Sequence, residues 1–359
     1  MKAVYSSPAS PALQSGKFMK LEGLRGILCL SVAMGHYGVE NIFHRVGLGL
    51  NFSYAVNVFF VISGFVLAHS NYYGSKSVGL YEFSVKRFAR LYPLHIASLL
   101  LAVAVYFASG REINWIIFAQ NIFLVQNIGL NPNLYSFNFP SWSVSVEFWC
   151  SIIFFVVTRV FAARELFVIT ALLVGVASIF FMNIVRTYPP ANVALGLNAG
   201  LLNGLVGFAL GICVYHVTSI PICKRVLSGK WAGWFACIGL VLFFVVDISP
   251  RWSFTFYCFA ALAVAVAACR STENGLLNAR PILWLGKISF SIYLIHIPMA
   301  LAAGYLFGEA SIKGSAGKFV LLSAVIVAST MTYRIFEMSC QWKLRGWLLR
   351  PRGAPVDAS

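Results

Sequence analysis

The sequence predicts an all-α protein that crosses a membrane about ten times, and three observations support this. Hydrophobic residues make up 59% of the 359 residues and charged residues only 11%, whereas about a quarter of a typical soluble domain is charged. The apolar residues gather in stretches of about 20, which is the length of a bilayer-spanning helix. Lys and Arg residues are concentrated in every second connection between these stretches. Functions that need a large aqueous domain are therefore disfavoured.

Ten apolar segments can be drawn along the chain. They cover residues 22–43, 48–70, 88–109, 141–161, 166–184, 197–217, 231–247, 252–269, 287–307 and 318–337. Segment 111–127 is too short and too rich in Asn and Gln to cross comfortably, so we expect it to be interfacial or re-entrant. The chain thus divides into a flexible N-terminal tail (1–16), a transmembrane domain (17–340) and a basic cytoplasmic C-terminal tail (341–359).

The net charge of +16 indicates topology rather than a nucleic-acid partner. If the N-terminus is cytoplasmic, most of the 27 Lys and Arg residues fall on the cytoplasmic side of the ten segments, as the positive-inside rule requires. An even number of crossings then places both termini in the cytoplasm. We expect a multi-pass protein of the cell (inner) membrane, surrounded by lipids, with no nucleic acid bound.

The first segment carries two ionisable residues on one face. Arg25 and His36 are separated by 11 positions, which on a helix places them within about 20° of each other and roughly 16 Å apart along the axis. Ionisable groups inside a span are costly and indicate function. The alternative is that Arg25 anchors the helix end and His36 is a hydrogen-bonded interior histidine. Glu40, one turn further on, either orients the imidazole or is solvated.

The third and tenth segments have charged residues at their cytoplasmic ends. Arg87 and Arg90 share one helix face, and two guanidinium groups there can hold a phosphate or pyrophosphate bidentately. Cytoplasmic helix ends are also rich in Arg without any ligand. Arg334 and Glu337 close the tenth segment, where a structural ion pair is at least as well supported as a binding role.

The fourth and ninth segments contain polar stripes. Ser143 and Glu147 lie one turn apart, and a carboxylate at this depth can orient or deprotonate a hydroxyl group or pair with a buried cation. Ser289, Tyr293 and His296 follow one face of the ninth segment. Polar residues also hold membrane helices together, so a packing role is the alternative for this stripe.

The sequence lacks the motifs of soluble enzymes. It has no P-loop, no GxSxG, no HExxH and no Cys/His cluster with zinc spacing. We therefore expect no metal and no permanently bound cofactor. Any phosphate group would have to be held by Arg side chains.

Six elements, taken together and in order, resemble acyltransferase family 3, a family of integral membrane proteins that move acyl groups onto sugars and other hydroxylated acceptors. They are Leu21–Gly26 followed by His36, Phe59–Phe65, Lys86–Pro93, Ser141–Glu147, Ser289–Pro298 and Tyr333–Glu337. The resemblance covers nearly the whole chain. This sequence departs from the family pattern at Asn57, where Asp is usual, at Phe148, where a second acidic residue is frequent, and at Met338, where Pro is usual.

The resemblance implies an enzyme that moves an acyl group, with acetyl expected, from cytoplasmic acyl-CoA to a hydroxyl of a carbohydrate or glycolipid. It implies that Arg25, Arg87 and Arg90 hold the CoA phosphates while the thioester lies near His36. His36 then acts as a general base or as a nucleophile that carries the acyl group. Glu147 is expected to orient the acceptor or the imidazole.

Supporting roles in substrate binding or oxyanion stabilisation are expected for Ser143, Trp142, Tyr293, His296 and Glu40. Some members of the family carry a fused extracytoplasmic esterase-like domain. The ten segments leave no room for such a domain in this sequence, so the chain is expected to act alone or with a separate extracytoplasmic partner. The main alternative is a transporter of a small polar or anionic solute, because intramembrane His, Arg and Glu also mark transport pathways. A purely structural membrane protein is the third alternative.

Overall fold

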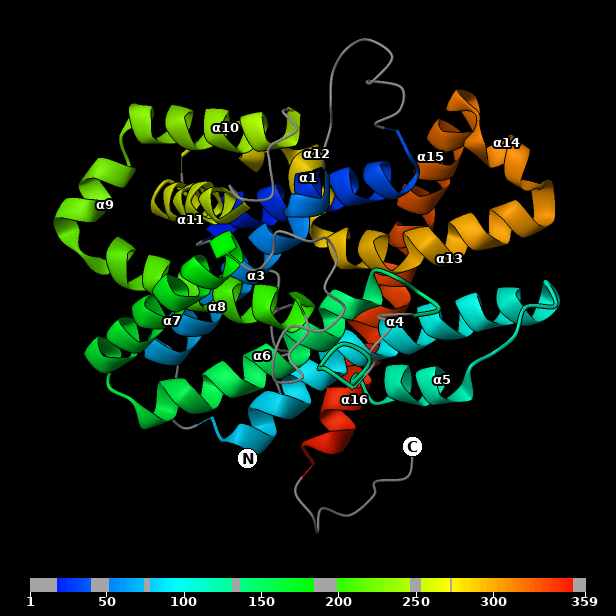
Figure 1. The fold of residues 1–359 in the computed structure, drawn as a ribbon, viewed down its shortest axis with the longest axis horizontal. Coiled ribbons are helices and arrows are strands. Elements are labelled where there is room, and N and C mark those ends of the chain that lie inside the picture. Colours follow the sequence, from blue (N-terminus) through cyan, green and yellow to red (C-terminus); the bar gives the residue numbers. More distant parts are fainter. Residues whose placement is uncertain are drawn as a thin grey trace, which may run out of the picture.

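The computed structural model describes residues 18–39, 52–73, 78–130, 136–183, 199–245, 253–271 and 273–350. Within them the regular structure is entirely helical (Figure 1). The α-helices are α1 (Met19–His36), α3 (Ala55–Tyr73), α4 (Leu80–Ala108), α5 (Trp115–Ile122), α6 (Ser141–Val160), α7 (Ala163–Asn183), α8 (Ala199–Ser219), α9 (Pro221–Leu227), α10 (Lys230–Val245), α11 (Ser253–Cys269), α12 (Arg280–Lys287), α13 (Ser289–Phe307), α14 (Glu309–Lys313), α15 (Ser315–Thr332) and α16 (Gln341–Leu348). Two 3₁₀ turns, η3 (Phe52–Tyr54) and η5 (Leu276–Asn278), and a π-helix, η6 (Tyr333–Cys340), complete the described elements.

Several helices are long and apolar enough to cross a bilayer. In the described part of the chain they are Leu80–Ala108, Ser141–Val160, Gly200–Ser219, Ser289–Phe307 and Ser315–Leu348, and α9 and α10 add a sixth if this pair, bent by 66°, forms one broken span. Three further apolar helices are shorter. The predicted all-helical membrane class is confirmed, whereas the number of about ten crossings and the cytoplasmic position of both termini remain predictions.

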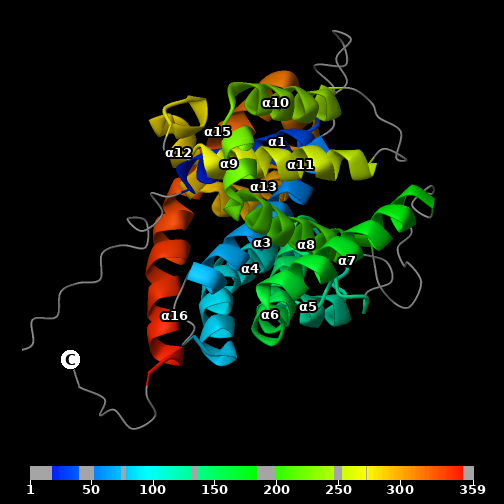
Figure 2. The ribbon, with the colours of Figure 1, turned by 90° about the vertical axis from the view of Figure 1, so that its left-hand side faces the viewer.

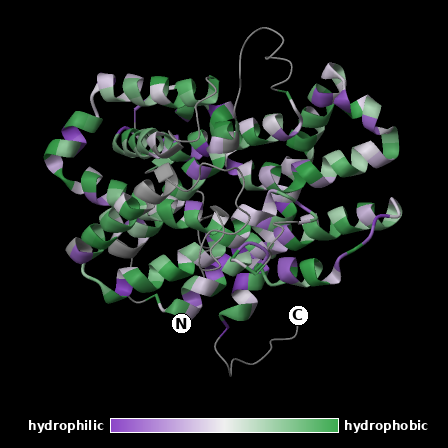
Figure 3. Cartoon of the chain, viewed as in Figure 1, coloured by the Kyte–Doolittle hydropathy of each residue, from purple (hydrophilic) through white to green (hydrophobic). Residues whose placement is uncertain are grey.

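The bundle has a buried apolar core, but unlike a soluble protein it also has a strongly apolar exterior. Large apolar side chains such as Phe107 (78% exposed) and Trp231 (86%) lie on the outside, while His95, Asn121 and His296 are fully buried. Figure 3 shows hydrophobic residues along the outer helices and hydrophilic residues gathered towards the middle of the bundle. This distribution is typical of a protein with lipid on the outside and hydrogen-bonded polar groups within.

Glycines allow α3 and α8 to pack closely along their lengths. A Cβ atom on Gly64 would collide with the backbone of Phe208, and a Cβ atom on Gly211 would collide with the carbonyl oxygen of Val61. Because helices in lipid gain little from the hydrophobic effect, close backbone approach at small residues is a main source of their association. This contact fixes α3, which forms one wall of the site described below.

The C-terminal helix is longer than predicted. The last apolar segment was expected to end at residue 337, with a tail from 341, but the helix continues through the π-helix and α16 to Leu348. Met338 retains the backbone N–H that proline would lack, so the helix has no reason to break there. Figure 2 shows α16 extending beside α4.

Gly211→Ala should destabilise the protein by about 1–3 kcal/mol, because the added methyl group meets backbone atoms that cannot move aside cheaply. The matched control is Gly346→Ala on α16, where a Cβ atom would enter open space and the change should be neutral or slightly stabilising. Thermal unfolding of both variants in detergent provides the comparison. Equal melting temperatures for the two variants would contradict close packing at Gly211.

Candidate active site

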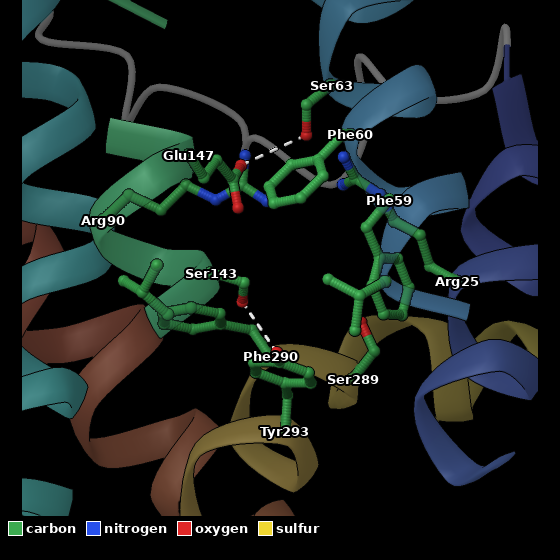
Figure 4. A pocket seen from close by; sticks show the side chains of 12 residues that line it. Arg25, Phe59, Phe60, Ser63, Arg90, Ser143, Glu147, Ser289, Phe290 and Tyr293 are labelled. Carbon is green, nitrogen blue, oxygen red and sulfur yellow. Dashed lines mark hydrogen bonds between the residues drawn. The ribbon is translucent and has the colours of Figure 1, made fainter. Parts of the chain in front are cut away.

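A pocket opens between five helices that are distant in sequence, namely α1, α3, α4, α6 and α13 (Figure 4). Its lining residues are Arg25, Val56, Phe59, Phe60, Ser63, Arg90, Ser143, Val144, Glu147, Ser289, Phe290 and Tyr293. Five of the predicted site residues are among them, from four different helices. The structure therefore brings together side chains that the sequence places up to 268 positions apart.

Arg25 and Arg90 supply two cations to opposite walls of this pocket (Figure 4). Both side chains are half-buried. Neither takes part in any of the salt bridges that the described residues form. A charged group away from bulk water is costly unless a partner compensates it. Two such guanidinium groups facing one cavity are suited to an anionic ligand with several oxygens.

Arg87 has a different environment from Arg90. Its guanidinium pairs with the Glu147 carboxylate at 3.6 Å and lies 5.5 Å from the centre of the Phe83 ring. Glu147 also accepts a hydrogen bond from Ser63 at 3.2 Å (Figure 4). Arg87 is absent from the pocket lining. In this structure it compensates Glu147, and Arg90, one turn further along α4, is the cation that reaches the pocket.

A buried hydroxyl pair lies at the end of the pocket away from Arg25. Ser143 Oγ lies 3.2 Å from the Pro140 carbonyl oxygen, to which it can donate. It also shares a 2.7 Å hydrogen bond with the Tyr293 hydroxyl, in which either oxygen can be the donor (Figure 4). Both side chains are 7% exposed. The pair joins α6 to α13 and places two hydroxyl groups at the cavity wall.

A pair of histidines from α1 and α13 lies next to Tyr293. His36, the last residue of α1, and His296 in α13 are joined by a 2.9 Å hydrogen bond between Nδ1 of His36 and Nε2 of His296. His296 is fully buried, whereas His36 is exposed and contacts the edge of the Phe139 ring. The Tyr293 and His296 ring centres are 6.1 Å apart. The histidine pair therefore lies next to the pocket, and we call the pocket together with His36 and His296 the polar column.

A proline in α13 explains part of the local hydrogen bonding. Pro298 has no N–H, so the helix offers no donor to the carbonyl group of Leu294, four residues earlier. The Asn138 side chain donates to that carbonyl at 2.8 Å. Tyr37 donates to the backbone carbonyl oxygen of His296 at 2.7 Å. These two bonds hold the turn of α13 that carries His296.

The other predicted residues are placed as follows. Trp142 packs against the Phe60 ring outside the pocket lining, and Glu40 lies outside the described residues. Glu147 forms no direct hydrogen bond with His36 in the described part of the chain; its partners are Arg87 and Ser63.

The expected Arg334–Glu337 ion pair is not formed among the described residues, and Glu337 instead accepts a 2.6 Å hydrogen bond from Ser291. Both residues lie in the π-helix, whose wider turn separates side chains three positions apart that would share a face in an α-helix. Sequence reasoning therefore missed the link from η6 to α13.

No role was assigned from the sequence to Ser63 or Tyr37, and the partner of Asn138 on α13 was not predicted. Ser63 carried a signal, because it interrupts a long apolar run directly before Gly64. The partners of Asn138 and Tyr37 are backbone carbonyl groups on α13. A sequence pattern does not predict hydrogen bonds from a side chain to a backbone carbonyl group on a distant helix.

Comparisons with known proteins agree on one class of enzyme. A family model described as an acyltransferase domain matches residues 20–334. The chain is 27% identical over 360 residues to acyltransferase MdmB of Streptomyces mycarofaciens, covering 89% of this chain and 90% of that protein. It is 23% identical over 360 residues to O-acetyltransferase OatA of Staphylococcus aureus, covering 88% of this chain and 56% of that protein, so it spans little more than half the length of OatA. No solved structure matches the chain.

A double-mutant cycle tests the Ser143–Tyr293 hydrogen bond. Ser143→Ala and Tyr293→Phe each remove one hydroxyl group of a buried pair, so the double variant should be less destabilised than the sum of the single variants, with a coupling of about 0.5–1.5 kcal/mol. Unfolding of the four proteins in detergent measures it. Strictly additive effects would show that the two hydroxyl groups do not interact.

Proposed function

Because the chain belongs to the acyltransferase domain family and is an acyltransferase, we propose that it transfers a short acyl group from acyl-CoA to a hydroxyl group of a carbohydrate or glycoconjugate. The observation that carries this proposal is the polar column, in which two arginines outside the described salt bridges face one pocket, beside a histidine pair with an exposed imidazole. A phosphorylated donor and a base for a hydroxyl group are what such a transfer needs.

The donor binds through its phosphate groups to Arg25 and Arg90. Guanidinium groups form strong charge-assisted hydrogen bonds with phosphate oxygens. Arg25 lies in the N-terminal half of α1 and His36 at its C-terminal end, so the helix sets their spacing at roughly 16 Å. The polyanion remains near the cytoplasmic surface and only the acyl end reaches the middle of the bundle. This avoids the large cost of moving phosphates into hydrocarbon.

The name of the relative OatA, an O-acetyltransferase, supports the choice of an acetyl group and of a hydroxyl acceptor.

His36 acts as the general base in the proposed reaction. Its imidazole takes the proton of the acceptor hydroxyl as the oxygen attacks the thioester carbonyl carbon. When Ser143 donates to Tyr293 in the bond they share, the Tyr293 hydroxyl, on the cavity wall, donates its own proton to the oxyanion of the tetrahedral intermediate. The carbon–sulfur bond then breaks, and the CoA thiolate takes the proton back from His36. The products are the O-acyl ester and free CoA, so His36 ends in its starting state.

The acceptor approaches the exposed side of His36. The Phe139 ring, 53% exposed, contacts His36 edge-on at 5.8 Å between ring centres. An aromatic ring beside a catalytic imidazole suits the apolar face of a sugar. The proposal places the enzyme in the cytoplasmic membrane, with about ten crossings, both termini inside and the acceptor on the outer side.

Turnover of acetyl-CoA by the purified protein in lipid nanodiscs tests the proposal, with release of free CoA thiol as the signal. Arg25→Gln and Arg90→Gln should each raise KM for acetyl-CoA at least tenfold, since a charge-assisted bond contributes about 1.5–3 kcal/mol. Arg225→Gln, which removes an exposed charge on α9, is the matched control and should leave KM unchanged. His36→Ala should abolish turnover while a thioether analogue of acetyl-CoA still binds.

Two results would contradict the proposal. Wild-type protein that neither binds nor cleaves any acyl-CoA would exclude this donor. Solute flux through proteoliposomes without release of CoA would favour the transporter alternative instead.

A further inference from the structure

The hydrogen bonds of His296 define where its proton lies. Nδ1 of His296 is 3.0 Å from the Ile292 carbonyl oxygen, and a carbonyl oxygen can only accept. The proton of His296 is therefore on Nδ1. The ring is fully buried and has no carboxylate among its hydrogen-bond partners in the described structure, so the neutral form is strongly favoured.

The position of the His296 proton determines that of His36. A neutral imidazole with its proton on Nδ1 can only accept at Nε2. The 2.9 Å bond between the two rings must then be donated by Nδ1–H of His36. The second nitrogen of His36, Nε2, consequently carries the lone pair, and it lies on the part of the ring that does not bond to His296.

We infer that His296 is a positioning residue that holds the proton of His36 on Nδ1 and thereby keeps Nε2 as the base for the acceptor hydroxyl. The role of the base rests on the proposed function, whereas the tautomer follows from the hydrogen bonds alone. Nδ1–H remains a donor to His296 when Nε2 has taken the acceptor proton, so the same bond persists through the reaction. The partner of one ring nitrogen commonly sets the state of the other.

The surroundings of His296 favour a positioning role for this residue over direct participation in the reaction. Its backbone is held by Tyr37 at its own carbonyl and by Asn138 at the carbonyl of Leu294. It does not line the pocket that holds Arg25 and Arg90. The rings of His36 and His296 lie within 21° of parallel. His296 can thus set both the proton and the ring orientation of His36.

Two substitutions separate positioning from simple packing. His296→Leu keeps an apolar side chain in the site but removes the acceptor for His36, so kcat should fall about 100-fold, within the range that general-base catalysis contributes, with KM for acetyl-CoA unchanged. His296→Gln offers an amide donor for Ile292 and a carbonyl acceptor for His36, and it should recover most of the lost rate. His216→Leu, at a half-buried histidine of α8, is the matched control and should retain wild-type kcat.

Nitrogen-15 NMR of histidine-labelled protein in nanodiscs reads the tautomer without any turnover. The signals of His36 are those lost in His36→Ala. Wild-type protein should show a protonated Nδ1 and an unprotonated Nε2 at His36, and His296→Leu should show both tautomers. All variants are first checked for monodispersity and helix content, so that misfolding is recognised separately.

A His36 signal with the proton on Nε2 in the wild type would overturn the inference. So would wild-type kcat in His296→Leu, or equal losses in His296→Leu and His296→Gln. If the wild type turns over no acyl-CoA, the proposed function fails, while the NMR result still decides the tautomer.

Discussion

The bilayer interior cannot form hydrogen bonds, and this one constraint accounts for much of the bundle's internal structure. Each backbone polar group inside needs a hydrogen-bond partner within the protein. The carbonyl of Leu294 takes its partner from Asn138 because Pro298 leaves it without one. The carbonyl of Leu124, whose φ is positive, accepts from both Ser145 and Trp149. Irregular backbone is thus tolerated where side chains of α6 and its preceding loop satisfy it.

The same constraint draws attention to charged groups that face the cavity outside the described salt bridges. Arg25 and Arg90 line a cavity and form none of the described salt bridges, whereas Arg87 on the same helix as Arg90 is compensated by Glu147. Two guanidinium groups one turn apart on α4 therefore have different environments. Arg87 pairs with a carboxylate, and Arg90 faces the cavity.

Close helix packing brings these groups to one place. Gly26 follows Arg25, and a Cβ atom there would meet the backbone of Gly286 in α12. This contact draws α1 against the segment that leads into α13, where Ser289 and Tyr293 line the same cavity as Arg25. At the other end of α1, His36 meets His296. The glycines therefore position the polar column although they take no part in its chemistry.

The sequence by itself determined the membrane class, the apolar segments and the polar candidates, including the shared face of Arg25 and His36, because hydropathy and helical periodicity are local properties. Only the tertiary structure decided which candidates meet. The bond between His36 and His296 joins residues 260 positions apart, and the pairing of Arg87 with Glu147 depends on how α4 and α6 pack. The packing of α16 against α4 is likewise a tertiary contact. Periodicity states which face of a helix is polar, but packing decides what that face contacts.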